Sequence, residues 1–383
     1  MKYFLICLAL CLTVSGQPFT LRPAGPATAG GGKSRVVVLE NPAVVDQFRV
    51  NDQLLAGNFN RALLTLTNQT ATADAWRQFV TPRDVVAIHV TTTGGQVLST
   101  HRALVNAIAS GLQAASVPAR NIIVWDKFGD DLQAAGYTAG SGPYRCQSVI
   151  PGAGFAGDKF YFNDIAGQLI WGDHDFRGKK LSDLLQADDL TVSGTQPLIP
   201  NLSPEVNGTA TVSGSTPADP PQVSNRSYYA ALLTRRVTKI INVPVMSSDE
   251  RIGLAGCVSS LSFASVDNTR RFLNAHEASA EAIAEIFASD LIQPKTVLHI
   301  MDGTLAQYAG GPYFVPNYCA QPGLLYLSRD PVAIDTLALE RIEAWRKAKA
   351  IDPVGQDATH LPQAVHLNLG TTDKSRMEII NLR

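Results

Sequence analysis

The segment that most constrains the fold covers residues 239–273. It begins with apolar and β-branched residues at 240–245, a run short enough and branched enough for a strand that is buried on both faces. Pro244 limits this strand, because proline has no backbone N–H to donate. A polar loop is expected at 247–251 and a helix at 252–263. Strand, polar loop and helix form the repeating unit of α/β proteins, in which ligands bind beyond the carboxyl ends of the strands.

Further runs of strand length occur along the chain, and helical periodicity separates most of them. The other expected strands cover residues 35–39, 84–90, 121–125, 295–301 and 324–328. The other expected helices cover residues 51–67, 73–79, 101–114, 130–135, 228–236, 278–287 and 332–348. The alternation of strands and helices predicts an α/β fold with a mainly parallel sheet flanked by helices.

The composition changes between about residues 140 and 227, where Gly, Ser, Thr and Pro dominate and apolar runs are short. We interpret this range as an irregular insertion with short β-hairpins, and its best strand candidates are residues 160–163 and 169–171. Residues 35–383 are therefore expected to form a single α/β domain that contains this insertion.

The first residues have the pattern of a signal peptide. Lys2 precedes an apolar run at 3–14, and small residues then lead to an expected cleavage site before Gln17. Residues 1–16 are predicted to be the signal and residues 17–34 a flexible leader. The chain is thus expected to be exported, to a periplasm or to the extracellular space.

The overall charge and the apolar segments exclude some classes of partner. The formal net charge is −1, which gives no electrostatic case for binding nucleic acid or an acidic membrane surface. No stretch after the signal is long enough to cross a bilayer, so no transmembrane segment is expected in the mature chain. The partner that we expect is a small-molecule ligand, because of the polar groups at the strand ends that are described below.

The motifs of common cofactor sites are lacking or occur in the wrong context. Cys146, Cys257 and Cys319 remain after the signal, and no CxxC pair among them indicates an iron–sulfur site. The GxGxxG letters at 152–157 are followed by a strand-like run and not by a helix, so no dinucleotide site is expected. The Asp-His-Asp sequence at 173–175 is a weak metal candidate, because adjacent strand residues point to opposite faces. The sequence neither requires nor excludes a divalent metal ion, and it identifies no ligands for one.

Polar side chains follow several expected strands, and a parallel sheet brings such strand ends to one edge. We expect a small-ligand cleft there. His89, Asp126 and Asp302 are the candidate catalytic residues, with His89 as base or metal ligand and the two carboxylates as its partners. The candidate ligand-binding residues are Thr91, Lys127, Asn242, Ser247 and Asp249. The alternative is that these groups only end strands, or that His89 is a core histidine bonded to a carbonyl.

Several motifs are similar to those of a known family. The segments IINVPV, SVDNTRRF, LHIMDG, GGPY and DPVAID, with VVAIHV, LSTH and NIIVWD before them, occur in the order of the family catalogued as domain of unknown function 362. The resemblance runs from about Arg35 to Arg346 and implies an α/β domain. Some relatives carry cysteine-rich ferredoxin segments, which this chain lacks.

The chain departs from this family at charged positions. The resemblance implies lysine and asparagine where His89 and Thr91 stand, and further charged or amide groups near Ser247 and Ser259. The family's residues at Asp126, Asn242, Asp302, Asp330 and Asp335 are kept. These substitutions fit a changed substrate or a member that has lost catalysis.

Three functions follow from these observations. The first is an enzyme that acts on a small molecule through His89, Asp126 and Asp302, with or without a metal ion. It requires these three side chains around one cavity. The second is a binding or scaffold protein with a degenerate, non-catalytic site. The third, a redox partner, has the least support because the cysteine motif is missing.

Overall fold

The structure is a computed structural model that describes residues 32–168, 223–273 and 276–383. The expected signal peptide, most of the expected leader, the expected strand at 169–171 and the Asp-His-Asp sequence at 173–175 lie outside the described residues.

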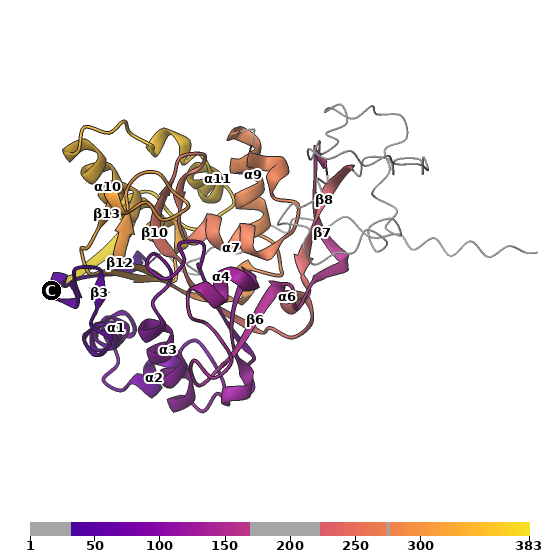
Figure 1. The fold of residues 1–383 in the computed structure, drawn as a ribbon. Helices are drawn as coiled ribbons and strands as arrows, with labels where there is room; N and C mark the ends of the chain where they lie inside the picture. The colour runs from indigo at the N-terminus through magenta and orange to yellow at the C-terminus, as the bar shows by residue number, and fades with distance from the viewer. Residues whose placement is uncertain (1–31, 169–222, 274–275) are drawn as a thin grey trace, which may run out of the picture.

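One large sheet forms the centre of the fold (Figure 1) and confirms the predicted α/β class. In order across the sheet its main strands are β15 (Met377–Leu382), β1 (Ser34–Glu40), β14 (Leu324–Ser328), β12 (Thr296–Gln307), β9 (Lys239–Val243), β4 (Val86–Val90), β5 (Ile122–Phe128) and β6 (Arg145–Ile150). Strand β14 is antiparallel to both of its neighbours, β1 and β12, and the other adjacent pairs are parallel. The sheet is therefore mixed but mainly parallel.

Helices cover both faces of this sheet, as Figure 1 shows. One face carries α1 (Asp52–Thr67), α2 (Thr72–Arg77) and α3 (Arg102–Ala114). The other carries α7 (Cys257–Ser265), α9 (His276–Phe287), α10 (Pro331–Ala348) and α11 (His360–His366). Because successive strand residues point to opposite faces, Ile88 packs in the core with α3 and Ala87 in the core with α7. This alternation decides on which side of the sheet each polar side chain lies.

The other elements are short or lie off the main sheet path. They are the helices α4 (Gly129–Ala134), α6 (Ala231–Arg235) and α8 (Arg270–Leu273), and the strands β2 (Val45–Asp46), β3 (Arg49–Val50), β7 (Phe155–Gln168), β8 (Val223–Ala230), β10 (Val245–Asp249), β11 (Gly253–Ala255) and β13 (Cys319–Ala320). Strands β7 and β8 pair antiparallel, as the prediction of short hairpins requires. Strand β6, within the range interpreted as insertion, belongs to the main sheet.

Several local predictions are wrong, each because non-local strand pairing overrides the local pattern. The expected polar loop at 247–251 is largely strand β10, which pairs with β12 and β11, so the next helix begins only at Cys257. The expected helix at 228–236 is confirmed only over α6, because residues 228–230 are the end of β8. Strand β12 does not end before Asp302; it continues to Gln307, beside β14 and β13.

Within the described ranges, none of the helices combines the length and the apolar character that crossing a bilayer requires. Cys146, Cys257 and Cys319 are free thiols.

Candidate functional site

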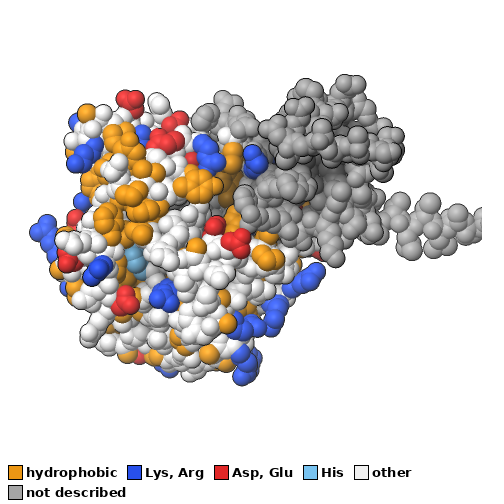
Figure 2. Space-filling model, viewed as in Figure 1, with side chains coloured by type: hydrophobic (Ala, Val, Ile, Leu, Met, Phe, Trp, Pro, Cys, Tyr) orange, Lys and Arg blue, Asp and Glu red, His pale blue; other side chains and the backbone are white. Residues whose placement is uncertain are grey.

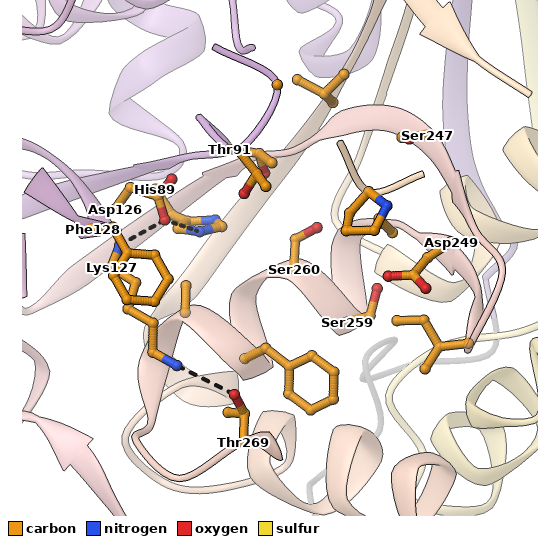
Figure 3. Close-up of a pocket in the computed structure, with 18 of the residues that line it drawn as sticks. His89, Thr91, Asp126, Lys127, Phe128, Ser247, Asp249, Ser259, Ser260 and Thr269 are labelled. Atoms are coloured by element: carbon orange, nitrogen blue, oxygen red, sulfur yellow. Dashed lines mark hydrogen bonds and ion pairs between the residues drawn. The ribbon is translucent and has the colours of Figure 1, made fainter. Parts of the chain in front are cut away.

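A cavity of about 220 Å³ lies at the carboxyl ends of β4 and β5 (Figure 3). Its walls come from the loop after β4, the end of β5, strand β10 and helix α7. Much of the surface is apolar, and the large apolar side chains in it are Leu98, Phe128, Val245, Ile252, Phe263 and Leu273. A concave, largely apolar surface with a few polar groups is the usual form of a small-molecule site.

Most of the predicted site residues line this cavity. His89, Thr91, Asp126, Lys127, Ser247 and Asp249 do so. Figure 3 shows His89, Asp126 and Lys127 together on one side, Ser247 and Asp249 on β10 at the other, and Ser259 and Ser260 of α7 between them. Asn242 lies beneath the cavity as the hydrogen-bond partner of His89. Asp302 does not contribute to the lining.

The hydrogen bonds of Asn242 determine which nitrogen of His89 carries the proton. Asn242 is fully buried on β9, and its Nδ2 lies 2.7 Å from the carbonyl oxygen of Cys257. Because a carbonyl can only accept, this contact fixes the amide so that Oδ1 faces Nδ1 of His89 at 2.8 Å. His89 must therefore donate from Nδ1, and in the neutral ring Nε2 is left with a lone pair.

The same amide bonds a second buried histidine. Nδ2 of Asn242 lies 3.1 Å from Nδ1 of His299 on β12, and this nitrogen must accept. Burial lowers the pKa of His299 to about 3, so its ring is neutral near pH 7. Asn242 thus holds both imidazoles in defined tautomers, and of the two rings only that of His89 lines the cavity.

The free nitrogen of His89 lies near a carboxylate. Nε2 is 3.9 Å from Oδ1 of Asp126, too far for a direct hydrogen bond but close enough to stabilise a charged ring. Burial lowers the pKa of His89 below its ordinary 6.5, although the charge of Asp126 and the bond to Asn242 oppose the shift. His89 is therefore neutral at pH 7, and a proton that it accepts would face Asp126.

The carboxylate of Asp126 is held in place by its own hydrogen bonds. Oδ2 accepts from the backbone N and the Oγ1 of Thr92, at 2.9 and 2.6 Å, and Oδ1 accepts from the backbone N of Lys127 at 2.6 Å. These bonds link the end of β5 to the loop after β4. They keep the negative charge beside His89 and restrict its reorientation.

The other charged groups of the lining have partners within the protein. Asp249 accepts from the backbone N, Nε and Nη2 of Arg251, at 2.9, 3.0 and 2.8 Å. Nζ of Lys127 lies 3.5 Å from Oγ1 of Thr269 and 5.6 Å from the ring centre of Phe128. The charges of the pocket are therefore largely satisfied before any ligand enters.

Helix α7 is fixed at its N-terminus by a carboxylate from α10. Asp335 accepts from the backbone N of Cys257 at 2.6 Å and of Val258 at 3.0 Å. Burial raises the pKa of Asp335 to about 7 against the opposing effect of these bonds. Gly256 permits the approach, because a Cβ there would lie 2.4 Å from Oδ1 of Asp335. The carbonyl of Cys257, which orients Asn242, is thereby held in place as well.

The prediction that Asp302 shares a cavity with His89 and Asp126 is wrong. Asp302 lies in the middle of β12, and its side chain points toward α3, on the opposite face of the sheet from His89. Its Oδ2 accepts from both the backbone N and Nδ1 of His101, at 2.9 and 2.8 Å, and Oδ1 accepts from the backbone N of Thr304 at 3.0 Å. Asp302 therefore forms a structural pair with His101.

The described residues give no support for a metal in this cavity. In these parts of the chain, no three His, Cys, Asp or Glu side chains are arranged to hold a metal ion. His89 and Asp126 alone offer too few protein ligands for a structural or catalytic zinc site. We therefore derive no step through a metal.

Sequence reasoning missed the apolar part of the site. Phe128 and Phe263 follow ordinary strand and helix patterns, so nothing in the sequence distinguishes them from core residues.

Pro312 closes another part of the cavity, and the adjacent Tyr313 is 70% exposed. Hydrophobic side chains gather over α10 and β13 on the face shown in Figure 2.

Comparison with known proteins links part of the chain to a family. No curated protein matches the chain. Residues 213–340, which include β9, β10, α7, β12, β14 and the beginning of α10, match the model of the family described as Domain of unknown function (DUF362). His89 and Asp126 lie before the matched segment. The match confirms the resemblance that the sequence motifs indicated: over the segment that supplies β10 and α7 to the cavity, the chain is similar to the DUF362 family.

Proposed function

We propose that the protein binds a small molecule in the cavity at the ends of β4 and β5, and that His89 accepts a proton from it. The observation that carries this proposal is the lone pair on Nε2 of His89. The Asn242 amide fixes the tautomer, and Asp126 lies where it would stabilise the resulting imidazolium. Such a group acts as a general base at neutral pH.

In this proposal, the groups around His89 have separate roles in the proton transfer. Asn242 orients the ring through Nδ1, as a carbonyl or carboxylate does in other histidine bases. Asp126 supplies electrostatic stabilisation once the ring is charged. The apolar part of the walls lowers the polarity around the two groups and so strengthens this attraction.

His299 provides a matched control for His89, because both imidazoles bond Asn242 and only His89 lines the cavity. We expect His89→Gln to weaken binding of small molecules found by ligand-observed NMR screening by about tenfold, the effect of losing roughly one hydrogen bond in a dry site. His299→Gln should leave the affinity within about twofold, although both variants lose stability. Equal losses of affinity in the two variants, or none in either, would contradict a role for His89 in binding.

A purely binding function is the second candidate. It is favoured by the identity of the group that orients His89, a neutral amide instead of a carboxylate. An amide stabilises the imidazolium less than a charged partner does, which makes His89 a weaker base. Turnover of a bound ligand by the wild type, lost in His89→Gln at a ligand concentration that saturates the variant, would decide for catalysis.

We also propose that the chain is exported. The positive charge, apolar run and small residues of the first 16 positions support this.

A further inference from the structure

The charges that line the cavity limit the kind of molecule that fits it. The described lining contains two carboxylates, Asp126 and Asp249, and two cations, Lys127 and Arg251, so its formal charge is zero while His89 is neutral. Asp249 and Arg251 neutralise each other directly. A charged ligand would leave water for a largely apolar cavity that has no net charge to offset the lost hydration. The balance therefore favours an uncharged ligand.

A second polar group of the lining complements His89. Thr91 comes two residues after His89, which places both side chains on the same side of an extended chain. Its Oγ1 is buried, and no protein group within the described residues bonds it. Figure 3 shows Thr91 and His89 on the same side of the cavity. Buried hydroxyls normally have a partner, and rotation of the Thr91 side chain about χ1 would turn this oxygen toward a ligand in the cavity.

The two groups together select one ligand chemistry. Nε2 of neutral His89 can only accept a hydrogen bond, and Oγ1 of Thr91 can donate one. A ligand hydroxyl satisfies both, because it has one proton to donate and lone pairs to accept with. A carboxylate has no proton for Nε2 and is repelled by Asp126. An ammonium could donate to both groups, but it would leave the hydroxyl proton of Thr91 without an acceptor and would lose its hydration in a largely apolar cavity.

We propose that the cavity takes a small, uncharged molecule with an apolar body and a hydroxyl group, which donates to Nε2 of His89 and accepts from Oγ1 of Thr91. This inference rests on the proposed function of the same site and defines its ligand class. The cavity of about 220 Å³ corresponds to roughly seven water molecules at about 30 Å³ each, which suits a ring with one short substituent.

Three probes with the same ring and different head groups test this class: benzyl alcohol, benzoate and benzylamine. We expect NMR titration at pH 7.5 to give benzyl alcohol a dissociation constant at least about tenfold lower than that of either charged probe. Tighter binding of benzoate or benzylamine in the cavity would overturn the proposed class. If none of the three shifted resonances of the cavity residues, both the class and the small-ligand site itself would be overturned.

A variant of Thr91 separates the specific contact from general apolar binding. Thr91→Val keeps the shape, and we expect it to weaken benzyl alcohol binding by about fivefold, the effect of one neutral hydrogen bond. The melting temperature should be unchanged or higher, because the variant removes a buried hydroxyl that has no protein partner. Thr93→Val removes another hydroxyl from the lining and should change the affinity by less than about twofold. Equal effects of the two variants would overturn the role of Thr91.

Discussion

Replacing Asn242 by leucine should lower the free energy of unfolding by about 4 kcal/mol, because it leaves two buried polar groups without a partner at about 1–3 kcal/mol each. These groups are Nδ1–H of His89 and Nδ1 of His299, and the carbonyl of Cys257 loses its bond to the amide as well. Leucine matches asparagine in shape, so the loss reports the hydrogen bonds more than a cavity. Urea denaturation of the variant and the wild type measures it.

Asn58 provides the matched control. It is also a buried asparagine, but among the described residues its side chain has one hydrogen bond, in which Oδ1 accepts from Nδ2 of Asn41 at 3.4 Å. Asn58→Leu should cost less than about 1 kcal/mol. If Asn242→Leu cost no more than this, the amide would not be the group that holds His89 in its tautomer.

Replacing Asp302 by alanine is expected to cost about 3 kcal/mol of stability, since removing one member of a buried pair costs about 3–5 kcal/mol and His101 can lose its charge in response. Asp302 is fully buried and accepts three hydrogen bonds, two of them from His101. Its side chain lies on the face of the sheet away from the cavity, so affinity for benzyl alcohol should stay within about twofold of the wild type. Urea denaturation and the NMR titration measure the two effects separately.

The exposed carboxylate Asp373 is the control for this variant, because it also accepts two hydrogen bonds, both from Ser375. Asp373→Ala should cost less than about 1 kcal/mol. If Asp302→Ala lost ligand affinity but kept its stability, Asp302 would act in the cavity and its assignment as a structural residue would be wrong.

The stability loss of Asp302→Ala should also depend on pH. Burial acts to raise the pKa of Asp302, but the charge and hydrogen bonds of His101 outweigh it and lower the pKa below 3.8; this contribution is lost as pH falls through that lowered value. Burial acts to lower the pKa of His101, but Asp302 outweighs it and raises the pKa above 6.5. That contribution is complete below 6.5 and is lost as pH rises through the raised value. The difference between variant and wild type should therefore be largest between about pH 4 and pH 6.5.

The sequence predicted the fold class because most strands are apolar runs that local pattern alone identifies. Strands β4 and β14 are examples, since both are buried along their whole length. Strand β10 was missed because its Ser247, Ser248 and Asp249 are polar and follow Pro244. They form a strand because two other strands supply their hydrogen bonds. Strand β12 is distant in the sequence and pairs parallel with β10, and β11 follows β10 and pairs antiparallel with it.

The directions of the strands predict which strand ends meet at the candidate site, but they do not predict on which face of the sheet each side chain lies. His89 and Asp126 meet because β4 and β5 are adjacent and parallel, which the sequence indicated. Asp302 was misplaced because the sequence does not say which face a residue occupies in a strand longer than expected. The role of Asn242 depends on the carbonyl of Cys257, and no local pattern relates these two residues.

The account depends most on one property: His89 keeps its proton on Nδ1 and leaves Nε2 as the acceptor in the cavity. Measurement of the imidazole ¹⁵N resonances of His89 across pH tests this directly. We predict an unprotonated Nε2 at pH 7, a pKa below 6.5, and a shift of the Nε2 resonance on addition of benzyl alcohol. A ring that carries its proton on Nε2 at pH 7, or whose Nε2 resonance does not respond to a ligand bound in the cavity, would contradict the account.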